Sequence, residues 1–123
     1  MNPLKISESE WQVMSVVWDR SPVSAAEVVS VLSPRTGWHT RTIRTLLARL
    51  VKKRALKIKP EGKRYMYEAR VSLEEGVRRE SQSFLQRVFG GQPAAMLLHL
   101  VGEAKLSKAD IQRLKNILSE KEK

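Results

Sequence analysis

Hydrophobic residues recur every three or four positions through the first part of the chain, in three segments separated by turn-forming residues. This spacing places them on one face of a helix, so three helices are expected. The first begins at Ser7, which can cap it, and ends near Arg20. The second follows Ser24, which forms a capping box with Glu27. We expect residues 33–37, which contain a proline and a glycine, to form a loop before the third helix.

The third segment, from about Thr40 to Lys53, separates apolar and polar positions into two faces. Its apolar positions follow the spacing i, i+3, i+4, i+7, i+8 and form one stripe: Ile43, Leu46, Leu47, Leu50 and Val51. The other side is basic or small: Arg41, Arg44, Thr45, Ala48, Arg49 and Lys52. We therefore expect a helix that is anchored by its apolar face and turns its guanidinium groups outward.

A β-hairpin is expected after this helix. Apolar and basic residues alternate over residues 55–59, and an aromatic, β-prone run covers residues 65–70, with a turn at residues 60–64 between them. Val23 is expected to add a very short strand. The order of three helices and a hairpin is that of a winged helix-turn-helix domain, which we place at residues 1–71.

From Ser72 onward the pattern is only helical. We expect a long helix up to Gly90, a short apolar helix over residues 94–101 and a last helix capped by Ser107, with a frayed, charged end. The apolar residues here are too many for a solvated appendage of so small a chain. The expected fold is mostly α with a small β-hairpin, and residues 72–123 are expected to be a helical dimerisation region about a twofold axis. The expected dimer contacts are Phe84, Leu85, Val88, Phe89, Met96, Leu97, Leu100, Ile111 and Leu114.

Charge points to a polyanionic partner. The 123 residues include 23 Lys and Arg against 13 Asp and Glu, a formal net charge of +10. Nucleic acid fits this balance, and by charge alone a membrane surface or a ribosome fits it equally. The absence of cysteine excludes disulfides, thiolate zinc sites and a cysteine nucleophile. Without an apolar run of about 18 residues or a signal peptide, we expect a cytoplasmic protein that does not insert into a membrane.

The outward side of the third helix has the chemistry of a DNA groove reader. Arginine can grip guanine O6 and N7, and threonine can donate to phosphate or place its methyl group against that of thymine. Residues at the helix start are expected to meet bases, and later ones the DNA backbone. The expected base readers are Thr40, Arg41, Arg44 and Thr45, with Thr42 nearby. The expected backbone contacts are His39 at the cap, Arg49, Lys52 and, from the hairpin, Lys57, Lys59, Lys63 and Arg64.

Each of these features also has a plainer interpretation. A basic helix face or hairpin is most often only solvated, and a lone histidine such as His39 is more often a plain surface or cap residue. We expect Trp11, Trp18 and Trp38 to pack in the core rather than stack on bases. His99 is expected to be packed or at a subunit contact, and no metal or other cofactor is expected, because neither histidine has a second ligand at metal spacing. No phosphate loop, carboxylate pair or nucleophile motif supports an enzyme.

Several motifs are spread over nearly the whole chain. They are Ile6-Ser7-x-x-Glu10-Trp11-x-Val13-Met14, Val17-Trp18, Trp38-x-x-x-Thr42-Ile43-x-Thr45-Leu46-Leu47-x-Arg49-Leu50-x-Lys52-Lys53, Tyr65-x-Tyr67 and Phe84-Leu85-x-x-Val88-Phe89-Gly90-Gly91. In these motifs the chain resembles the penicillinase repressor family, of the BlaI/MecI type. The resemblance implies a homodimeric winged-helix repressor of β-lactam resistance or related stress genes. It also implies that the family's DNA contacts correspond to Arg41, Thr42, Arg44, Thr45 and Arg49.

The resemblance further implies a route of derepression. Repressors of this family are cut at an Asn-Phe bond in the short tail helix, through a membrane sensor protease or a protease downstream of it. The matching positions here are His99 and Leu100, so the chain departs from the family at the cleavage site. His39 and Thr40 likewise stand where Ser-Pro is more usual. The cysteine-rich metal-binding tail of a copper-responsive branch is excluded, since the chain has no cysteine.

We therefore expect a sequence-specific transcriptional repressor that binds a palindromic double-stranded DNA operator as a homodimer. Two alternatives stay open. A non-sequence-specific or architectural nucleic-acid-binding protein would bind any duplex about equally. A protein-interaction adaptor would tolerate the replacement of Arg41, Arg44 and Arg49 without a change in duplex affinity.

Overall fold

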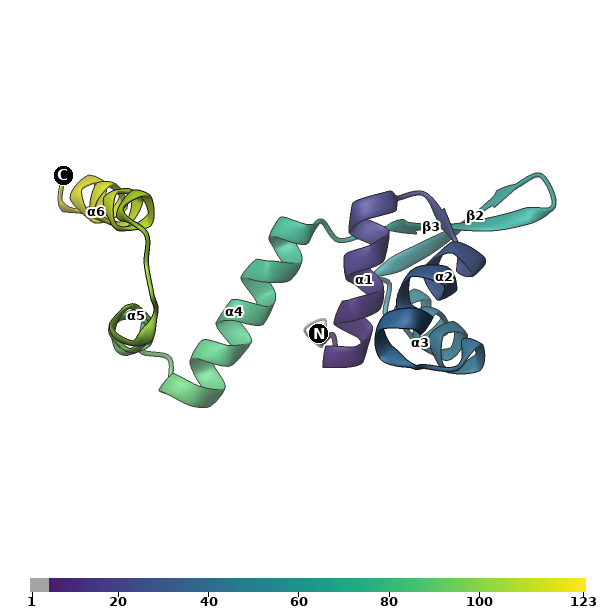
Figure 1. Cartoon of the computed structure of the whole chain (residues 1–123), viewed down its shortest axis with the longest axis horizontal. Coiled ribbons are helices and arrows are strands. Elements are labelled where there is room, and N and C mark those ends of the chain that lie inside the picture. Colours follow the sequence, from purple (N-terminus) through teal and green to yellow (C-terminus); the bar gives the residue numbers. More distant parts are fainter. Residues whose placement is uncertain (1–4) are drawn as a thin grey trace. The chain divides into compact units, whose positions relative to one another are not determined.

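The structure, a computed structural model, describes residues 5–123. Between these residues the chain forms six helices and three strands (Figure 1): α1 (Glu8–Arg20), β1 (Val23–Ser24), α2 (Ala25–Thr36), α3 (Thr40–Lys52), β2 (Leu56–Glu61), β3 (Arg64–Ala69), α4 (Leu73–Phe89), α5 (Pro93–Glu103) and α6 (Lys108–Glu122). The chain divides into two compact units, Met1–Ser81 and Gln82–Lys123, and the boundary falls within α4.

Capping boxes begin the first two helices, at the predicted positions. The Ser7 hydroxyl accepts a hydrogen bond from the Glu10 N–H at 3.1 Å, and the Glu10 carboxylate accepts from the Ser7 N–H at 2.8 Å. Ser24 and Glu27 repeat this exchange at the start of α2. Since the first turn of a helix leaves its N–H groups without intrahelical partners, these side chains fix where both helices begin.

The end of α2 corrects one expectation. The predicted loop over residues 33–37 is wrong, because α2 continues through Pro34 to Thr36. Proline has no N–H, so α2 lacks the helical hydrogen bond that residue 34 would donate to the Ser30 carbonyl. Gly37 is what ends the helix: its φ is 75°, and its N–H donates to the Ser33 carbonyl at 2.9 Å. The chain therefore turns into α3 over only three residues.

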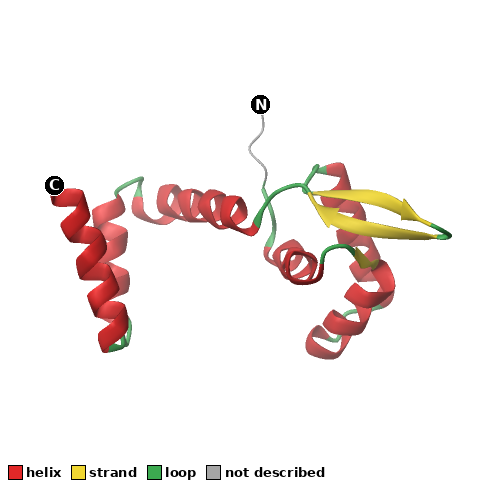
Figure 2. Ribbon diagram, turned by 90° about the horizontal axis from the view of Figure 1, so that it is seen from above, coloured by secondary structure: helices red, strands yellow, loops and turns green. Residues whose placement is uncertain are grey.

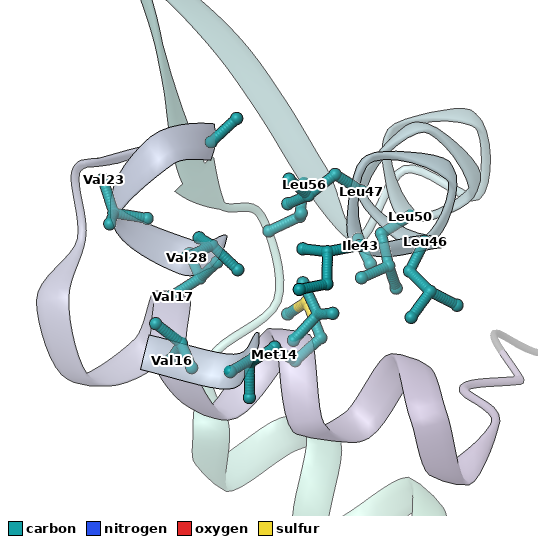
Figure 3. Packing of buried hydrophobic residues seen from close by; sticks show 14 residues of the cluster. Met14, Val16, Val17, Val23, Val28, Ile43, Leu46, Leu47, Leu50 and Leu56 are labelled. Carbon is teal, nitrogen blue, oxygen red and sulfur yellow. The ribbon is translucent and has the colours of Figure 1, made fainter. Parts of the chain in front are cut away.

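The core of the first unit lies between α1, α2, α3 and the sheet. Figure 3 shows side chains from the three helices converging, with Ile43, Leu46 and Leu50 on the side of α3 that faces Met14. The cluster contains Val13, Met14, Val16, Val17, Val23, Ala25, Val28, Leu32, Ile43, Leu46, Leu47, Leu50, Ala55 and Leu56, all buried. The apolar stripe predicted for α3 thus anchors this helix to the body of the unit.

The sheet is antiparallel, with strand order β1-β3-β2. The β2–β3 hairpin projects as the wing (Figures 1 and 2), and its register runs from the Leu56–Ala69 pair to the Glu61–Arg64 pair. The turn expected over residues 60–64 is therefore shorter, because the two strands continue to Glu61 and Arg64. Pro60 is compatible with β2 because β2 is an edge strand, where one missing N–H donor is tolerated.

The tryptophans are all half-buried, and the predicted packing against the core is found for Trp18 and Trp38. Trp11 and Trp18 meet edge to face with ring centroids 5.1 Å apart, and Trp38 packs against the core. The Trp18 Nε1–H donates to the Val71 carbonyl at 2.7 Å. A Cβ atom at Gly76 would lie only 2.9 Å from the Trp18 ring. The first turns of α4 therefore lie close to α1 at Gly76, which has no side chain.

The second unit has no buried core in a single chain. Residues 82–123 are all described, and none of them is buried. α6 extends to Glu122, so the fraying expected at the charged end is wrong. Large apolar side chains remain exposed in this unit: Phe84, Val88, Leu97, Leu98, Leu100, Val101, Ile111, Ile117 and Leu118.

A buried ion pair ties the start of α1 to the end of α3. Glu10 is 1% exposed, and its Oε1 accepts from the Lys53 Nζ at 2.6 Å. The same ammonium group donates to the Lys5 carbonyl at 2.8 Å. Burial raises the pKa of Glu10, but the hydrogen bonds from Lys53 and Ser7 outweigh it, so the pKa lies below its ordinary value of 4.5.

Replacing Glu10 with Gln should lower the free energy of unfolding by about 1–2 kcal/mol near neutral pH, because the hydrogen bond from the Lys53 ammonium loses its ionised acceptor. Since the Glu10 pKa is lowered on folding, the carboxylate stabilises the fold fully above pH 4.5 and ceases to do so as the pH falls through the lower, folded-state pKa. Urea denaturation between pH 7 and pH 3 should therefore show a shallower acid loss in Glu10→Gln than in the natural chain.

Glu75→Gln is the matched control, because Arg78 and Arg79 lower the pKa of Glu75 to about 2 at an exposed site on α4. Its effect at neutral pH should be smaller, since exposed ion pairs contribute little. Equal stability of Glu10→Gln and the natural chain at every pH would show that the buried pair does not stabilise the fold.

Candidate nucleic-acid interface

His39 is the N-cap of α3, as predicted. Its backbone is extended, with φ −70° and ψ 151°, and its Nδ1 accepts a hydrogen bond from the Arg41 N–H at 3.4 Å. The side chain is exposed at the positive end of the helix.

The outward face of α3 is exposed over its whole length. Ile43, Leu46, Leu47 and Leu50 are buried and Val51 is half-buried, which confirms the predicted apolar stripe. The opposite positions are all exposed: Thr40, Arg41, Thr42, Arg44, Thr45, Ala48, Arg49 and Lys52. The expected readers therefore lie together on one helix and point away from the protein body.

The basic groups of this face have no carboxylate partner among the residues that the structure describes. Between residues 5 and 123, none of the cations Arg41, Arg44, Arg49 and Lys52 forms an ion pair. Among the candidates in the hairpin, Lys57 and Lys59 are different, because their Nζ atoms lie 3.4 and 3.7 Å from the Glu68 carboxylate. The four predicted cations of α3 thus remain available to a phosphate, whereas Lys57 and Lys59 are partly neutralised.

The threonines of α3 differ in what their hydroxyl groups do. The Thr45 Oγ1 donates its hydrogen to the Arg41 carbonyl at 2.9 Å, whereas the Thr42 hydroxyl has no hydrogen-bond partner in the described chain. Thr42 can therefore still donate to a DNA acceptor. Thr45 has already used its donor, so this exposed residue can offer DNA only a methyl group and an oxygen lone pair.

The tip of the wing is a second, smaller basic site. Lys63 and Arg64 are exposed there, and neither is paired within the part of the chain that the structure describes. Tyr65 follows them and is 65% exposed, because strand alternation places it on the face opposite the buried Met66. In the sequence, Tyr65 belongs to a β-prone run and to the Tyr65-x-Tyr67 motif, and no contact is predicted for it. The period-two alternation of β3 was the signal that could have marked it as a surface residue of the wing.

The remaining predicted residues lie outside the α3 face and the wing. Phe84 and His99 each have ring centroids 6.0 Å from Phe89, so these three rings form one aromatic chain in the tail. His99 and Leu100, at the expected cleavage position, are both exposed on α5. Within residues 5–123 we find no cluster of side chains suited to hold a metal ion, and no helix in that range has the length and hydropathy to cross a bilayer.

Comparisons with known proteins agree with this arrangement. The profile of a family described as "Penicillinase repressor" matches residues 6–120. The penicillinase repressor of Bacillus licheniformis is 35% identical over 94% of this chain and 91% of its own length. The methicillin resistance regulatory protein MecI of Staphylococcus aureus strain N315 is 32% identical over 95% of each protein.

A solved structure shares the DNA-binding half of the fold. It is the solution structure of monomeric B. licheniformis BlaI in complex with the blaP half-operator, with a TM-score of 0.54 and 36% identity over 61% of this chain and 93% of that chain. The family profile and both relatives, by contrast, extend over nearly the whole chain. The chain belongs to the penicillinase repressor family.

Proposed function

We propose that the chain is a sequence-specific transcriptional repressor that binds a palindromic DNA operator as a homodimer. In this proposal residues 1–71 bind DNA and residues 72–123 form the dimer. The observation that carries it is the outward face of α3, where Arg41, Arg44 and Arg49 are exposed and unpaired within the described chain while the opposite face is anchored in the core. The BlaI relative, solved with a half-operator, supports DNA as the partner.

The regulated genes follow from the relatives. One is a penicillinase repressor and another is a methicillin resistance regulatory protein, both matched over more than nine-tenths of this chain. We therefore infer that the operator controls β-lactam resistance or related stress genes. The exposed basic face of α3 supports binding to an operator. It does not indicate which gene that operator controls.

The tail supports a dimer because its apolar side chains have no partners in one chain. α5 carries apolar residues on every side, and a helix of this kind is normally buried. Leu97 is 54% exposed and Leu100 47% exposed, although both belong to the predicted dimer contacts. A second copy that presents the same surface about a twofold axis would cover them.

A dimer also determines the form of the operator. Two copies present two α3 helices related by a twofold axis, so the preferred DNA carries two inverted half-sites. Their centres should be separated by one helical turn of DNA or a multiple of it, because both helices must enter the major groove on the same side of the duplex. Dimerisation and operator recognition are therefore parts of one proposal.

Family resemblance extends the proposal to derepression through a membrane sensor protease or a protease downstream of it. The bond at the family's cleavage position is His99–Leu100 in this chain, on an exposed stretch of α5. A protease that acts there would need to accept an imidazole before the cut and an aliphatic side chain after it. Its specificity would therefore differ from that of a protease that cuts Asn-Phe.

Arg44→Ala should weaken binding to a specific duplex by about 5- to 150-fold if Arg44 reads a base, because a good bidentate contact contributes about 1–3 kcal/mol. Duplexes are first selected from a random pool with the full chain, and affinity is then measured by fluorescence anisotropy against salt concentration. If Arg44 instead contacts a phosphate, the loss should be similar for all sequences and the salt slope should fall by about one.

Arg113→Ala, an exposed arginine on α6, is the control and should bind as the natural chain does. A scrambled competitor that displaces the selected duplex equally well would favour the architectural alternative. Unchanged duplex affinity after joint replacement of Arg41, Arg44 and Arg49 would contradict the proposed interface and favour the adaptor.

Leu97→Glu should convert the dimer into a monomer and weaken operator binding while the first unit stays folded, because a charge cannot be buried without a partner. Sedimentation equilibrium at micromolar concentration measures the first effect. Ala109→Glu, on the side of α6 away from its apolar positions, should leave the dimer intact. A natural chain that sediments as a monomer under these conditions would overturn the dimer.

A further inference from the structure

We propose that the centre of the outward face of α3 recognises thymine, through two side-chain methyl groups that meet the C5-methyl groups of the bases. The two residues are Thr45 and Ala48, both exposed on α3. The inference rests on the proposed function and deepens it, because it states which base chemistry the operator must present. Sequence analysis left two roles open for threonine, and the structure favours one of them for Thr45.

Helical geometry defines the centre of this face. Each residue advances about 100° around the helix axis, so the buried positions of α3 point in one mean direction. The residues that point most nearly the opposite way are Arg41, Thr45, Ala48 and Lys52. Arg44 lies to one side of this line, and Thr42 and Arg49 lie to the other. The middle of the line thus consists of the two smallest side chains, with basic residues at both ends.

The hydrogen bond of Thr45 limits what this residue can offer to DNA. Its hydroxyl hydrogen goes to the Arg41 carbonyl at 2.9 Å, in the preceding turn of the same helix. The side chain is nevertheless exposed, so the atoms available outward are the methyl group and an oxygen lone pair. Ala48 offers a methyl group alone. Thymine is the base that presents an apolar group, its C5-methyl, in the major groove.

Small residues at the centre also suit the dimensions of the groove. A helix with its side chains is about 10–12 Å across, close to the roughly 12 Å width of the major groove. Short side chains on the central line let the helix backbone approach the base edges. The longer Arg44 and Arg49 then lie towards opposite walls of the groove, where phosphates are found. Methyl contact at the centre and charge contact at the sides are thus compatible in one docked helix.

The test uses the natural chain and a duplex selected by it from a random pool. Each thymine of the duplex is replaced in turn by deoxyuridine, which keeps every hydrogen-bonding group and lacks only the C5-methyl group. At one or two thymines of each half-site the affinity should fall about fourfold, the effect of one buried methyl group. Thymines outside the half-sites should tolerate the replacement. This experiment requires no variant to fold.

Two variants at position 45 then assign the contact. Thr45→Val keeps a methyl group and should bind the thymine duplex as well as the natural chain does. Thr45→Ser keeps the hydroxyl group and should lose about fourfold on thymine while becoming indifferent to deoxyuridine at the same base. The two protein forms and the two bases make up a double-mutant cycle. Its coupling free energy measures the contact itself, because any general effect of the variant on affinity cancels.

The outcomes separate this inference from the proposed function. If the chain selects a specific duplex and every thymine can be replaced without loss, the methyl inference is wrong and the repressor proposal stands. A loss in Thr45→Val would assign the oxygen lone pair as the contact and would also overturn the inference. If no duplex is preferred over a scrambled one, the proposed function falls, and the inference falls with it.

Discussion

One constraint governs the first unit: α3 must bury one face of its side chains to stay in place and leave the opposite face exposed. Ile43, Leu47 and Leu50 satisfy the first requirement, since each is fully buried against the other helices. Both ends of α3 are then fixed by separate interactions. The cap at His39 fixes where the helix begins, and the pair of Lys53 with buried Glu10 holds the residue that ends it. The outward face is therefore held in a defined position, and each of its side chains has a defined place on the helix.

The two units use apolar side chains in opposite ways. In the first unit they converge on a core within one chain, as Figure 3 shows, while in residues 82–123 not one side chain is buried. A solvated helix can carry scattered apolar residues, but Leu97, Leu98 and Leu100 follow one another almost without interruption on α5. The tail thus lacks a partner in the single chain, and in the proposed dimer the same contacts would set the separation between two reading helices.

The sequence predicted those features that depend on local rules. The stripe of α3, the cap at His39 and the start of α2 at Ser24 all follow from short-range spacing, and the structure confirms each of them. The predictions were wrong at positions where the local structure also depends on the tertiary fold. Pro34 lies within α2 although it cannot donate a helical hydrogen bond, and Pro60 is accepted because β2 is an edge strand. No periodicity shows which strand of a sheet will lie at its edge.

The same limit applies to the candidate site. Its basic residues could be identified from the sequence, but their pairing could not, because pairing depends on strand register and helix packing. Lys57 and Lys59 appeared equivalent to the other wing cations until the β2–β3 register placed Glu68 beside them. Lys53 likewise continues the basic run of α3 in the sequence, yet in the structure its ammonium group is bound to Glu10. Only the folded structure shows which cations are free and which are neutralised by a carboxylate.

This distinction bears on how affinity and specificity are divided along α3. Free guanidinium groups attract any duplex, and their contribution weakens as salt rises. The central Thr45 and Ala48 carry no charge, so whatever they contribute differs between bases and changes little with salt. A chain of net charge +10 whose cations met only phosphates would bind DNA without discrimination. Arginines on both sides of an uncharged centre allow DNA phosphates to hold the helix. The bases can then determine where on the DNA it binds.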